Sequence, residues 1–166
     1  MVLLEDISNL NYDKILSYNN IDELINKEGY IGNSKYLLNP LITAISVYHD
    51  NPEVATKIIK FLMKNKNINV SRVFILKGKN GWSDEIYSVF HLIAELNIPY
   101  DICELILNAP SFNVESLNTI NHDDYRPLDL ADEYNKDIVK LIESKNGQRH
   151  FRVGPGFKKD TFNSPA

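Results

Sequence analysis

The chain has 166 residues, of which 43% are hydrophobic and 24% charged, a balance typical of one globular domain with a substantial core. Its net charge of −4 argues against non-specific nucleic-acid binding, which needs a basic face toward the phosphates. The sequence lacks the apolar run of roughly 18 residues that a transmembrane helix requires, so we expect no membrane segment. The single cysteine excludes an internal disulfide and favours a reducing, cytoplasmic compartment.

The charge is distributed unevenly along the chain. Residues 147–166 hold four basic residues against one acidic residue, a net charge of +3, which leaves −7 on the residues before them. An acidic body favours a basic partner through electrostatic complementarity. The first residues, 1–6, have neither a basic segment nor a long apolar segment, so we expect no secretory signal peptide.

The first part of the chain predicts short helices followed by a loop. Within residues 3–28, apolar side chains recur on one helical face, beginning with Leu3, Leu4, Ile7 and Leu10. Gly29 ends the last of these stripes. Residues 30–38 place turn residues between aromatic side chains, which predicts an extended loop or hairpin finger.

Three later segments, 39–70, 88–114 and 126–146, each predict a pair of short amphipathic helices. Pro40, Val89 and Pro127 stand at the start of the three first helices, and proline suits the first helical position because its missing N–H would have no partner there. A small residue recurs in each first helix, four or five positions after its start, where two helices must approach closely: Ala44, Ala94 and Ala131. Each second helix carries an apolar pair, namely Phe61-Leu62, Leu105-Ile106 and Leu141-Ile142. One such pair is too small to bury its own stripe, so the pairs need one another.

These segments resemble the ankyrin repeat, whose signature is T-P-L-H-x-A with a period of about 33 residues. Residues 126–131 (Arg-Pro-Leu-Asp-Leu-Ala) and 88–94 (Ser-Val-Phe-His-Leu-Ile-Ala) match best, and residues 39–45 match least well. The resemblance implies an all-α helix-turn-helix solenoid over residues 1–146, with about four repeats, hairpin fingers along one side, and a degenerate capping repeat at 11–38. It also implies a protein-binding role. A generic helical bundle is the alternative, but it does not explain the repeated order of residues.

The spacing departs from the family's period in one region. From Pro40 to Val89 the chain advances 49 residues, and from Val89 to Pro127 it advances 38. The surplus in the first interval lies at Asn51-Pro52 and in residues 71–87. Within 71–87 a β-prone apolar run, Val73–Leu76, precedes Asn80-Gly81, a dipeptide that favours a type I′ turn. We therefore expect an enlarged finger that forms a β-hairpin. Insertions in repeat proteins often lie on the binding face.

Residues 147–166 predict irregular structure because glycine and proline are frequent in them. Two interpretations remain open for this tail. It either packs back on the last helix pair and covers its apolar edge, or it serves as a recognition or export segment.

The sequence offers weak candidates for catalysis or metal binding. Cys103 and His91 could act as nucleophile and base, but Cys103 lies in an apolar stripe and His91 lies at the family's histidine position, where the ring bonds locally. Histidine and aspartate also meet at 49–50 and 122–124, without the spacing of a metal site. Asp123 and Asp124 more naturally shape the turn before Pro127. We expect no catalysis, no metal and no cofactor.

Trp82 is the strongest candidate for partner binding, because it lies beside a turn in a segment longer than the fold needs, and tryptophan is enriched at binding hot spots. Alternatively, Trp82 folds back on Phe74 and stabilises its own hairpin. We expect the concave side to be built from the fingers 30–38, 71–87 and 115–125 and the exposed face of the first helices. The expected contact residues are Trp82, Tyr87, Phe74, Arg72, Tyr36, Tyr48, Tyr125 and Asp124.

The predicted function is protein–protein recognition without catalysis, by a monomer or weak homodimer. An alternative is a self-assembling protein in which the apolar segment 73–76 pairs with its copy in a second molecule. A third hypothesis, a small enzyme with an unrecognised site, has no motif in its favour. By analogy, the composition and an ankyrin module also suit an effector that an intracellular bacterium delivers into a host cell.

Overall fold

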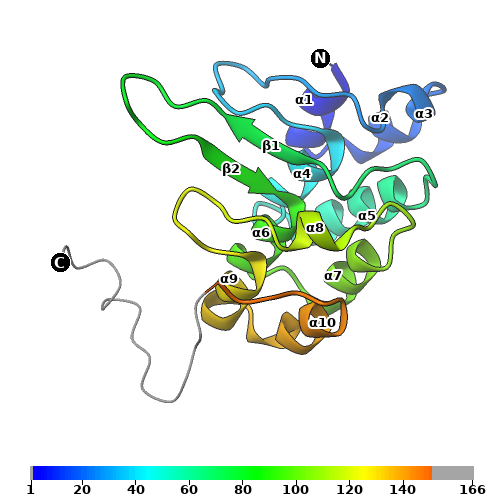
Figure 1. Cartoon of the computed structure of the whole chain (residues 1–166). Coiled ribbons are helices and arrows are strands. Elements are labelled where there is room, and N and C mark those ends of the chain that lie inside the picture. The colour runs from blue at the N-terminus through cyan, green and yellow to red at the C-terminus, as the bar shows by residue number, and fades with distance from the viewer. Residues whose placement is uncertain (1, 151–166) are drawn as a thin grey trace.

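Two rows of short helices run side by side through the molecule in a computed structural model that describes residues 2–150 (Figure 1). Helices of the first row each pack against the next: α1 (Val2–Ser8), α4 (Pro40–Ser46), α6 (Val89–Glu95) and α9 (Pro127–Tyr134). The second row contains α2 (Tyr12–Leu16), α5 (Pro52–Met63), α7 (Tyr100–Leu107), the 3-10 helix η1 (Lys136–Ile138) and α10 (Val139–Ser144). The predicted mostly helical class is confirmed.

One antiparallel hairpin projects beside the helices at the upper left of Figure 1. It consists of β1 (Val73–Leu76) and β2 (Glu85–Ser88), in a register that pairs Phe74 with Tyr87 and Ile75 with Ile86. Two further short helices lie between the rows and the loops: α3 (Ile21–Leu24) and α8 (Val114–Leu117). The β-hairpin predicted within residues 71–87 is therefore present.

The predicted starts of the three first helices are confirmed by their caps. The Asn39 side chain accepts a hydrogen bond from the backbone N–H of Ile42, and the Ser88 hydroxyl accepts one from the backbone N–H of His91. At α9, the Asp129 carboxylate accepts from the backbone N–H of Arg126. Each bond satisfies a group that a helix end would otherwise leave unpaired.

Small residues fill the contacts between successive first helices, as predicted. Ala44, Ala94 and Ala131 are fully buried where α4, α6 and α9 pack together. The second helices differ in detail from the expected stripes. In α5 the buried residues include Ala55 and Ile59, while Phe61 is only half-buried. In α7, Leu105 is exposed, because α7 packs between α5 and η1 and buries Cys103 and Leu107 in its place.

The N-terminal part is arranged differently from the expected pair at 11–38. The helix that packs against α4 is α1, which begins before that range, while α2 packs against α5. Residues 115–125 also differ from a simple finger, because their first part belongs to the short helix α8. Asn113 caps this helix by accepting a hydrogen bond from Ser116 N–H.

Within the described part of the chain, every helix is too short or too polar to traverse a lipid bilayer. Residues 147–150 form no helix or strand, in line with the prediction for the tail. The remainder of that segment, 151–166, lies outside the described residues.

Candidate binding site

Three projecting segments meet around one open groove, which we call the finger groove. They are the first finger (residues 30–38), the second finger (71–87, which holds β1 and most of β2) and the third finger (115–125). The groove encloses about 1130 Å³. Each finger contributes side chains to its walls, among them Tyr30 and Lys35, then Ile75, Lys79 and Trp82, and finally His122 and Asp123. The three fingers therefore share one groove, but the residues that line it include none from the first helices, whose exposed face was expected to contribute.

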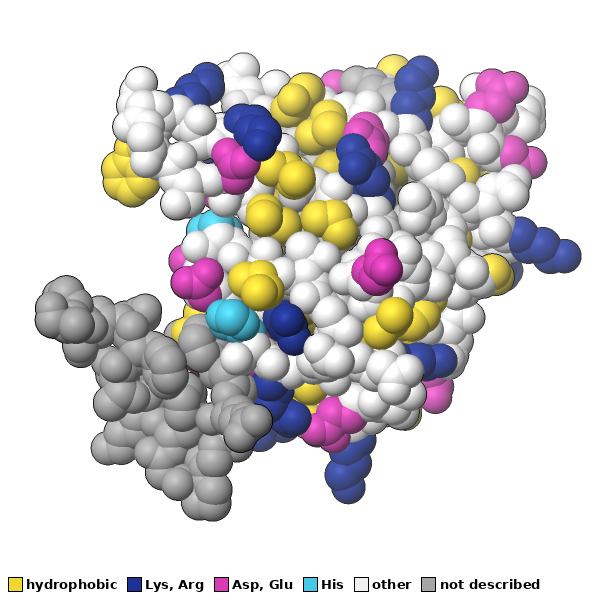
Figure 2. Space-filling view, in the orientation of Figure 1, with side chains coloured by type: hydrophobic (Ala, Val, Ile, Leu, Met, Phe, Trp, Pro, Cys, Tyr) yellow, Lys and Arg dark blue, Asp and Glu magenta, His cyan; other side chains and the backbone are white. Residues whose placement is uncertain are grey.

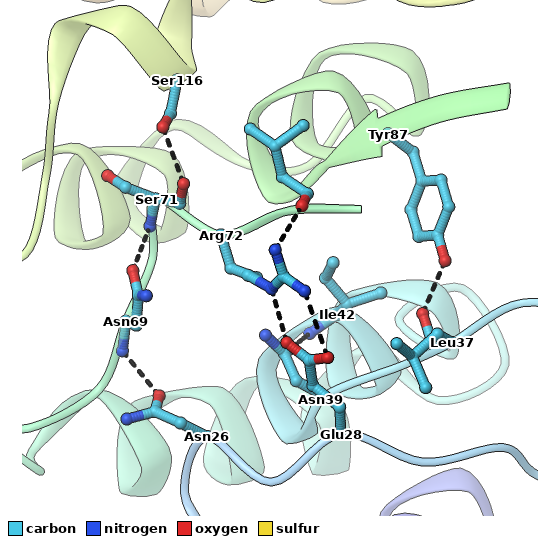
Figure 3. A network of polar contacts seen from close by, with 11 residues as sticks. Asn26, Glu28, Leu37, Asn39, Ile42, Asn69, Ser71, Arg72, Tyr87 and Ser116 are labelled. Atoms are coloured by element: carbon cyan, nitrogen blue, oxygen red, sulfur yellow. Dashed lines mark hydrogen bonds and ion pairs between the residues drawn. The ribbon is translucent and has the colours of Figure 1, made fainter. Parts of the chain in front are cut away.

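The base of the second finger is an aromatic cluster. Phe74 is 1% exposed and its ring stacks on that of Tyr87, with a centroid distance of 5.3 Å and an interplanar angle of 12°. The Tyr87 hydroxyl donates to the carbonyl oxygen of Leu37 at 2.6 Å, as Figure 3 shows. Burial raises the pKa of Tyr87 to about 12. The Tyr36 ring meets Tyr87 edge-on at 5.6 Å, so the first and second fingers are packed together.

Arg72 joins the second finger to the segment before the first finger. Its guanidinium pairs with the Glu28 carboxylate and donates to the backbone carbonyl of the next residue, Val73 (Figure 3). It also lies 5.1 Å from the centre of the Phe74 ring. The pairing with Glu28 is the main cause that raises the pKa of Arg72. These contacts give Arg72 a role in holding the hairpin base, although it remains partly exposed.

A ladder of side-chain and backbone hydrogen bonds ties the feet of the fingers together (Figure 3). The Asn69 N–H donates to the Asn26 side chain at 2.7 Å, and the Ser71 N–H donates to the Asn69 side chain at 3.0 Å. The Ser116 hydroxyl then donates to the Ser71 carbonyl at 2.7 Å. The fingers therefore project from a fixed base. The ladder was not predicted, although Asn and Ser recur in the sequence after α5 and after α7.

Glu85 links the first finger to β2. One carboxylate oxygen accepts from the Lys35 ammonium at 2.8 Å, and the other accepts from the Tyr36 hydroxyl at 2.7 Å. The bond from Lys35 is the main cause that lowers the pKa of Glu85. Lys35 and Glu85 both line the finger groove, so much of the charge in this wall is already paired.

The tip of the second finger is a tight turn, as predicted. Asn80 and Gly81 both have positive φ, at 56° and 84°, and the Trp82 N–H donates to the Lys79 carbonyl at 3.2 Å, which fits a type I′ turn. Gly78 passes so close to the turn that a Cβ there would lie 1.9 Å from the Trp82 carbonyl oxygen. The backbone of the tip is therefore compact and well defined.

Trp82 is 81% exposed at this tip, so it is not packed on Phe74. The interpretation in which Trp82 folds back to stabilise its own hairpin is wrong. Ile75 is 55% exposed and pairs with half-buried Ile86 on the face of the hairpin opposite Phe74. Figure 2 shows hydrophobic side chains gathered over the hairpin, with charged side chains around them.

The third finger closes in a turn that Asn121 shapes. Its side-chain oxygen accepts hydrogen bonds from the backbone N–H groups of Asp123 and Tyr125, at 3.0 and 2.9 Å. The shaping role expected for Asp123 and Asp124 therefore belongs to Asn121. Both aspartates are exposed, and Asp124 adopts a positive φ of 64°. They place negative charge at the third-finger end of the groove.

The expected contact residues divide into three groups. Trp82, Tyr36, Arg72 and Asp124 are exposed, whereas Tyr87 and Tyr125 are partly buried. Two expectations are wrong: Phe74 belongs to the core of the hairpin base, and Tyr48 is only 8% exposed because it follows α4 and packs into the main core. Several groove residues were missed, namely Tyr30, Lys35, Ile75, Lys79, His122 and Asp123.

His91 and Cys103 have structural surroundings. The His91 ring lies 2.8 Å from the Ser88 hydroxyl and 3.0 Å from the Thr119 carbonyl oxygen, and burial lowers its pKa to about 4. Burial raises the pKa of Cys103 to about 12, which suppresses the reactive thiolate. Residues 2–150 hold no cluster of three or more His, Cys, Asp or Glu side chains arranged for a metal ion. The chain matches no protein-family model, no curated protein and no solved structure.

Proposed function

We propose that this chain is an ankyrin-type helical-repeat protein, without catalytic activity, that recognises another protein through the finger groove. The observation that carries the proposal is the convergence of three separate fingers on one groove with an exposed tryptophan at its edge. A large, open site of this kind suits an extended segment of a partner protein better than a small molecule, which usually needs enclosure.

The packing of the helices supports the repeat assignment. First helices contact first helices along the chain, and second helices do the same. Hydrogen bonds that join the earlier layers connect residues at similar separations: 43 residues between Asn26 and Asn69, 41 between Val70 and Ser111, and 45 between Ser71 and Ser116. The last layer is shorter, because Asn118 bonds to Asn146 and Gln148 at separations of 28 and 30 residues. The regularity of the earlier layers is expected when each layer repeats the one before it, with longer connections than the usual ankyrin period of about 33 residues.

The groove also indicates the chemistry of the partner. Trp82 and Ile75 offer apolar surface, while Asp123 and Asp124 offer exposed carboxylates at the third-finger end. Within the protein, Lys35 and Lys77 have carboxylate partners, Glu85 and Asp84. The Asp123 carboxylate lies 3.3 Å from the His122 ring, which is charged only when it is protonated, and Lys79 also lines the groove. A partner segment with an apolar side chain and a basic side chain therefore fits best, and its binding should weaken as salt screens the aspartates.

The proposal predicts that Trp82 is a binding hot spot. Peptides selected from a random displayed library against the full chain should lose affinity for the Trp82→Ala variant by about 30-fold or more, or about 2 kcal/mol, because a large exposed anchor is removed. Fluorescence anisotropy of labelled selected peptides measures the change. Tyr100→Ala is the matched control, because Tyr100 is an exposed aromatic residue on α7, in the second row of helices and outside the groove lining. This substitution should leave the peptide affinity unchanged.

Two results would contradict the proposal. One is a set of selected peptides that binds Trp82→Ala as tightly as the unchanged protein. The other is a set whose affinity falls with Tyr100→Ala instead, which would place recognition on the helical face away from the fingers.

Self-association through β1 is a second candidate function. Within residues 2–150 the sheet has two strands, so the outward edge of β1 is available to a strand of another molecule, and Ile75 beside it is exposed. Arg72 and Lys77 flank β1, and antiparallel pairing of two copies would bring these like charges toward each other, which makes this candidate the weaker one. Light scattering at high micromolar concentration tests it. A strict monomer excludes it, and a dimer that Ile75→Lys dissociates supports it.

A further inference from the structure

We propose that residues 151–166 of this chain bind in the finger groove and compete there with the partner. The regulatory consequence rests on the proposed function, whereas occupancy of the groove by this segment can be tested on the protein alone. Residues 151–166 lie outside the described residues, so the argument starts from where the described chain leads and from the chemistry of the segment.

The last described residues run along the foot of the third finger. The Gln148 N–H donates to the Asn118 side chain at 2.7 Å, and the Gln148 side chain accepts from the Arg126 guanidinium at 3.2 Å. Asn118 and Arg126 stand at the two ends of the loop that carries His122 and Asp123 into the groove. The chain therefore leaves the helices beside one wall of the groove.

Two further contacts fix this exit. The Arg149 guanidinium pairs with the carboxylates of Asp132 and Glu143, and the pairing with Asp132 is the main cause that raises the pKa of Arg149. The His150 N–H donates to the Asp129 carboxylate at 3.0 Å. Asp129 lies in the first turn of α9, at the third-finger end of that helix, so the described chain ends close to the finger.

The groove lies within reach of the segment. From Arg126 to His122 is four residues along the chain, at most about 14 Å when extended, because an extended chain advances roughly 3.3–3.6 Å per residue. Residues 151–166 can span about 50 Å by the same measure. A tether of this length gives a high effective concentration at the groove, so a weak contact suffices for occupancy.

The segment has the apolar and basic side chains that we propose for a partner of the groove. It contains three phenylalanines, Phe151, Phe157 and Phe162, and three basic residues, Arg152, Lys158 and Lys159, against one acidic residue. The phenylalanines match the apolar surface of Trp82 and Ile75, and the basic residues match the exposed carboxylates of Asp123 and Asp124. The segment is positively charged in a chain whose net charge is −4.

The chain contains a single tryptophan, so the fluorescence of Trp82 reports directly on the groove. In the full chain, Phe157→Ser with Phe162→Ser should shift Trp82 emission to longer wavelength and raise its quenching by acrylamide severalfold, because the covering side chains are lost. The matched control is Asn163→Ala with Ser164→Ala in the same segment, which should behave like the unchanged protein. A synthetic peptide of residues 151–166 should reverse the change when it is added to the double-serine variant.

Charge reversal tests the same contact from the other side. Asp123→Lys with Asp124→Lys, placed in the double-serine variant, should weaken binding of the added peptide about tenfold at low salt. Circular dichroism establishes that each variant is folded. An affinity that charge reversal leaves unchanged would contradict the proposed contact between the basic residues of the segment and these aspartates.

Three outcomes would overturn the inference. Equal quenching of Trp82 in the unchanged chain and the double-serine variant would place the segment elsewhere, for example on α9 and α10. Protection of Trp82 that grows with protein concentration would assign the groove to a second copy. An added peptide that leaves Trp82 emission unchanged would show that the segment does not bind beside Trp82. These three results do not test whether peptides selected from the library need Trp82 for binding. The proposed function is therefore tested separately from this inference.

Discussion

The base and the tip of the β1–β2 hairpin hold aromatic side chains in opposite surroundings. At the base, Phe74 is stacked on Tyr87 and packed into the hydrophobic core. At the tip, Trp82 is 81% exposed with respect to the described residues, above a turn whose backbone is already fixed by Asn80 and Gly81. Because the turn does not need the Trp82 side chain, the base accounts for the stability of the hairpin, and the tip is the part that we propose for recognition.

Replacement of Phe74 by alanine gives the largest expected effect. Phe74→Ala removes a fully buried ring, and losses of this kind cost about 3–5 kcal/mol of unfolding free energy because a cavity remains. Urea denaturation followed by circular dichroism measures the loss. Ile75→Ala is the matched control on the opposite face of the same strand, where exposure should limit the loss to less than about 1 kcal/mol. Equal losses of unfolding free energy for the two variants would show that the buried and the exposed face of β1 contribute equally to stability.

Acidification should weaken the hairpin base and leave the tip unaffected. Ser88 ends β2, and its hydroxyl lies against the His91 ring, which also contacts the Thr119 carbonyl at the foot of the third finger. The pKa of His91 is lowered from 6.5 to about 4, so the unfolded chain binds the proton more readily between these values. Stability is therefore complete above about pH 6.5 and falls by about 3 kcal/mol as the pH drops toward 4.

The pH prediction has a direct spectroscopic check. By NMR, the imidazole resonances of His91 should remain those of the neutral ring down to about pH 5. The urea midpoint should fall with pH in the unchanged protein more steeply than in His91→Asn, in which this titration is absent. A His91 ring that becomes charged near pH 6.5 would show that the base is open to water and would remove the contrast with the tip.

Much of the fold follows from local sequence rules. Asn39 and Ser88 supply caps, Pro40 and Pro127 fit the first helical position, and Asn80-Gly81 specifies the turn of the second finger. These features depend on a few neighbouring residues, so they can be recognised without knowledge of the tertiary structure.

The side chains that form the site depend on packing that local rules do not specify. Val73–Leu76 is apolar at every position, so no alternation shows that Phe74 faces the core and Ile75 faces solvent. Tyr48 follows a helix end that could have been exposed, and only contact with the main core buries it. The walls of the groove come from three fingers distant in sequence, and their convergence depends on the ladder of bonds through Asn69 and Ser71.

The smallest expected effect on stability belongs to the residue with the largest expected effect on binding. Trp82→Ala should change the unfolding free energy by less than about 0.5 kcal/mol, as substitutions at exposed positions usually do, because the exposed ring adds little to the fold. Thermal and urea unfolding measured by circular dichroism, rather than by tryptophan fluorescence, provide the comparison. A loss above about 1 kcal/mol would mean that the ring stabilises its own hairpin. Loss of peptide affinity in the same variant would then reflect a distorted tip, and the division between a stabilising base and a recognising tip would fail.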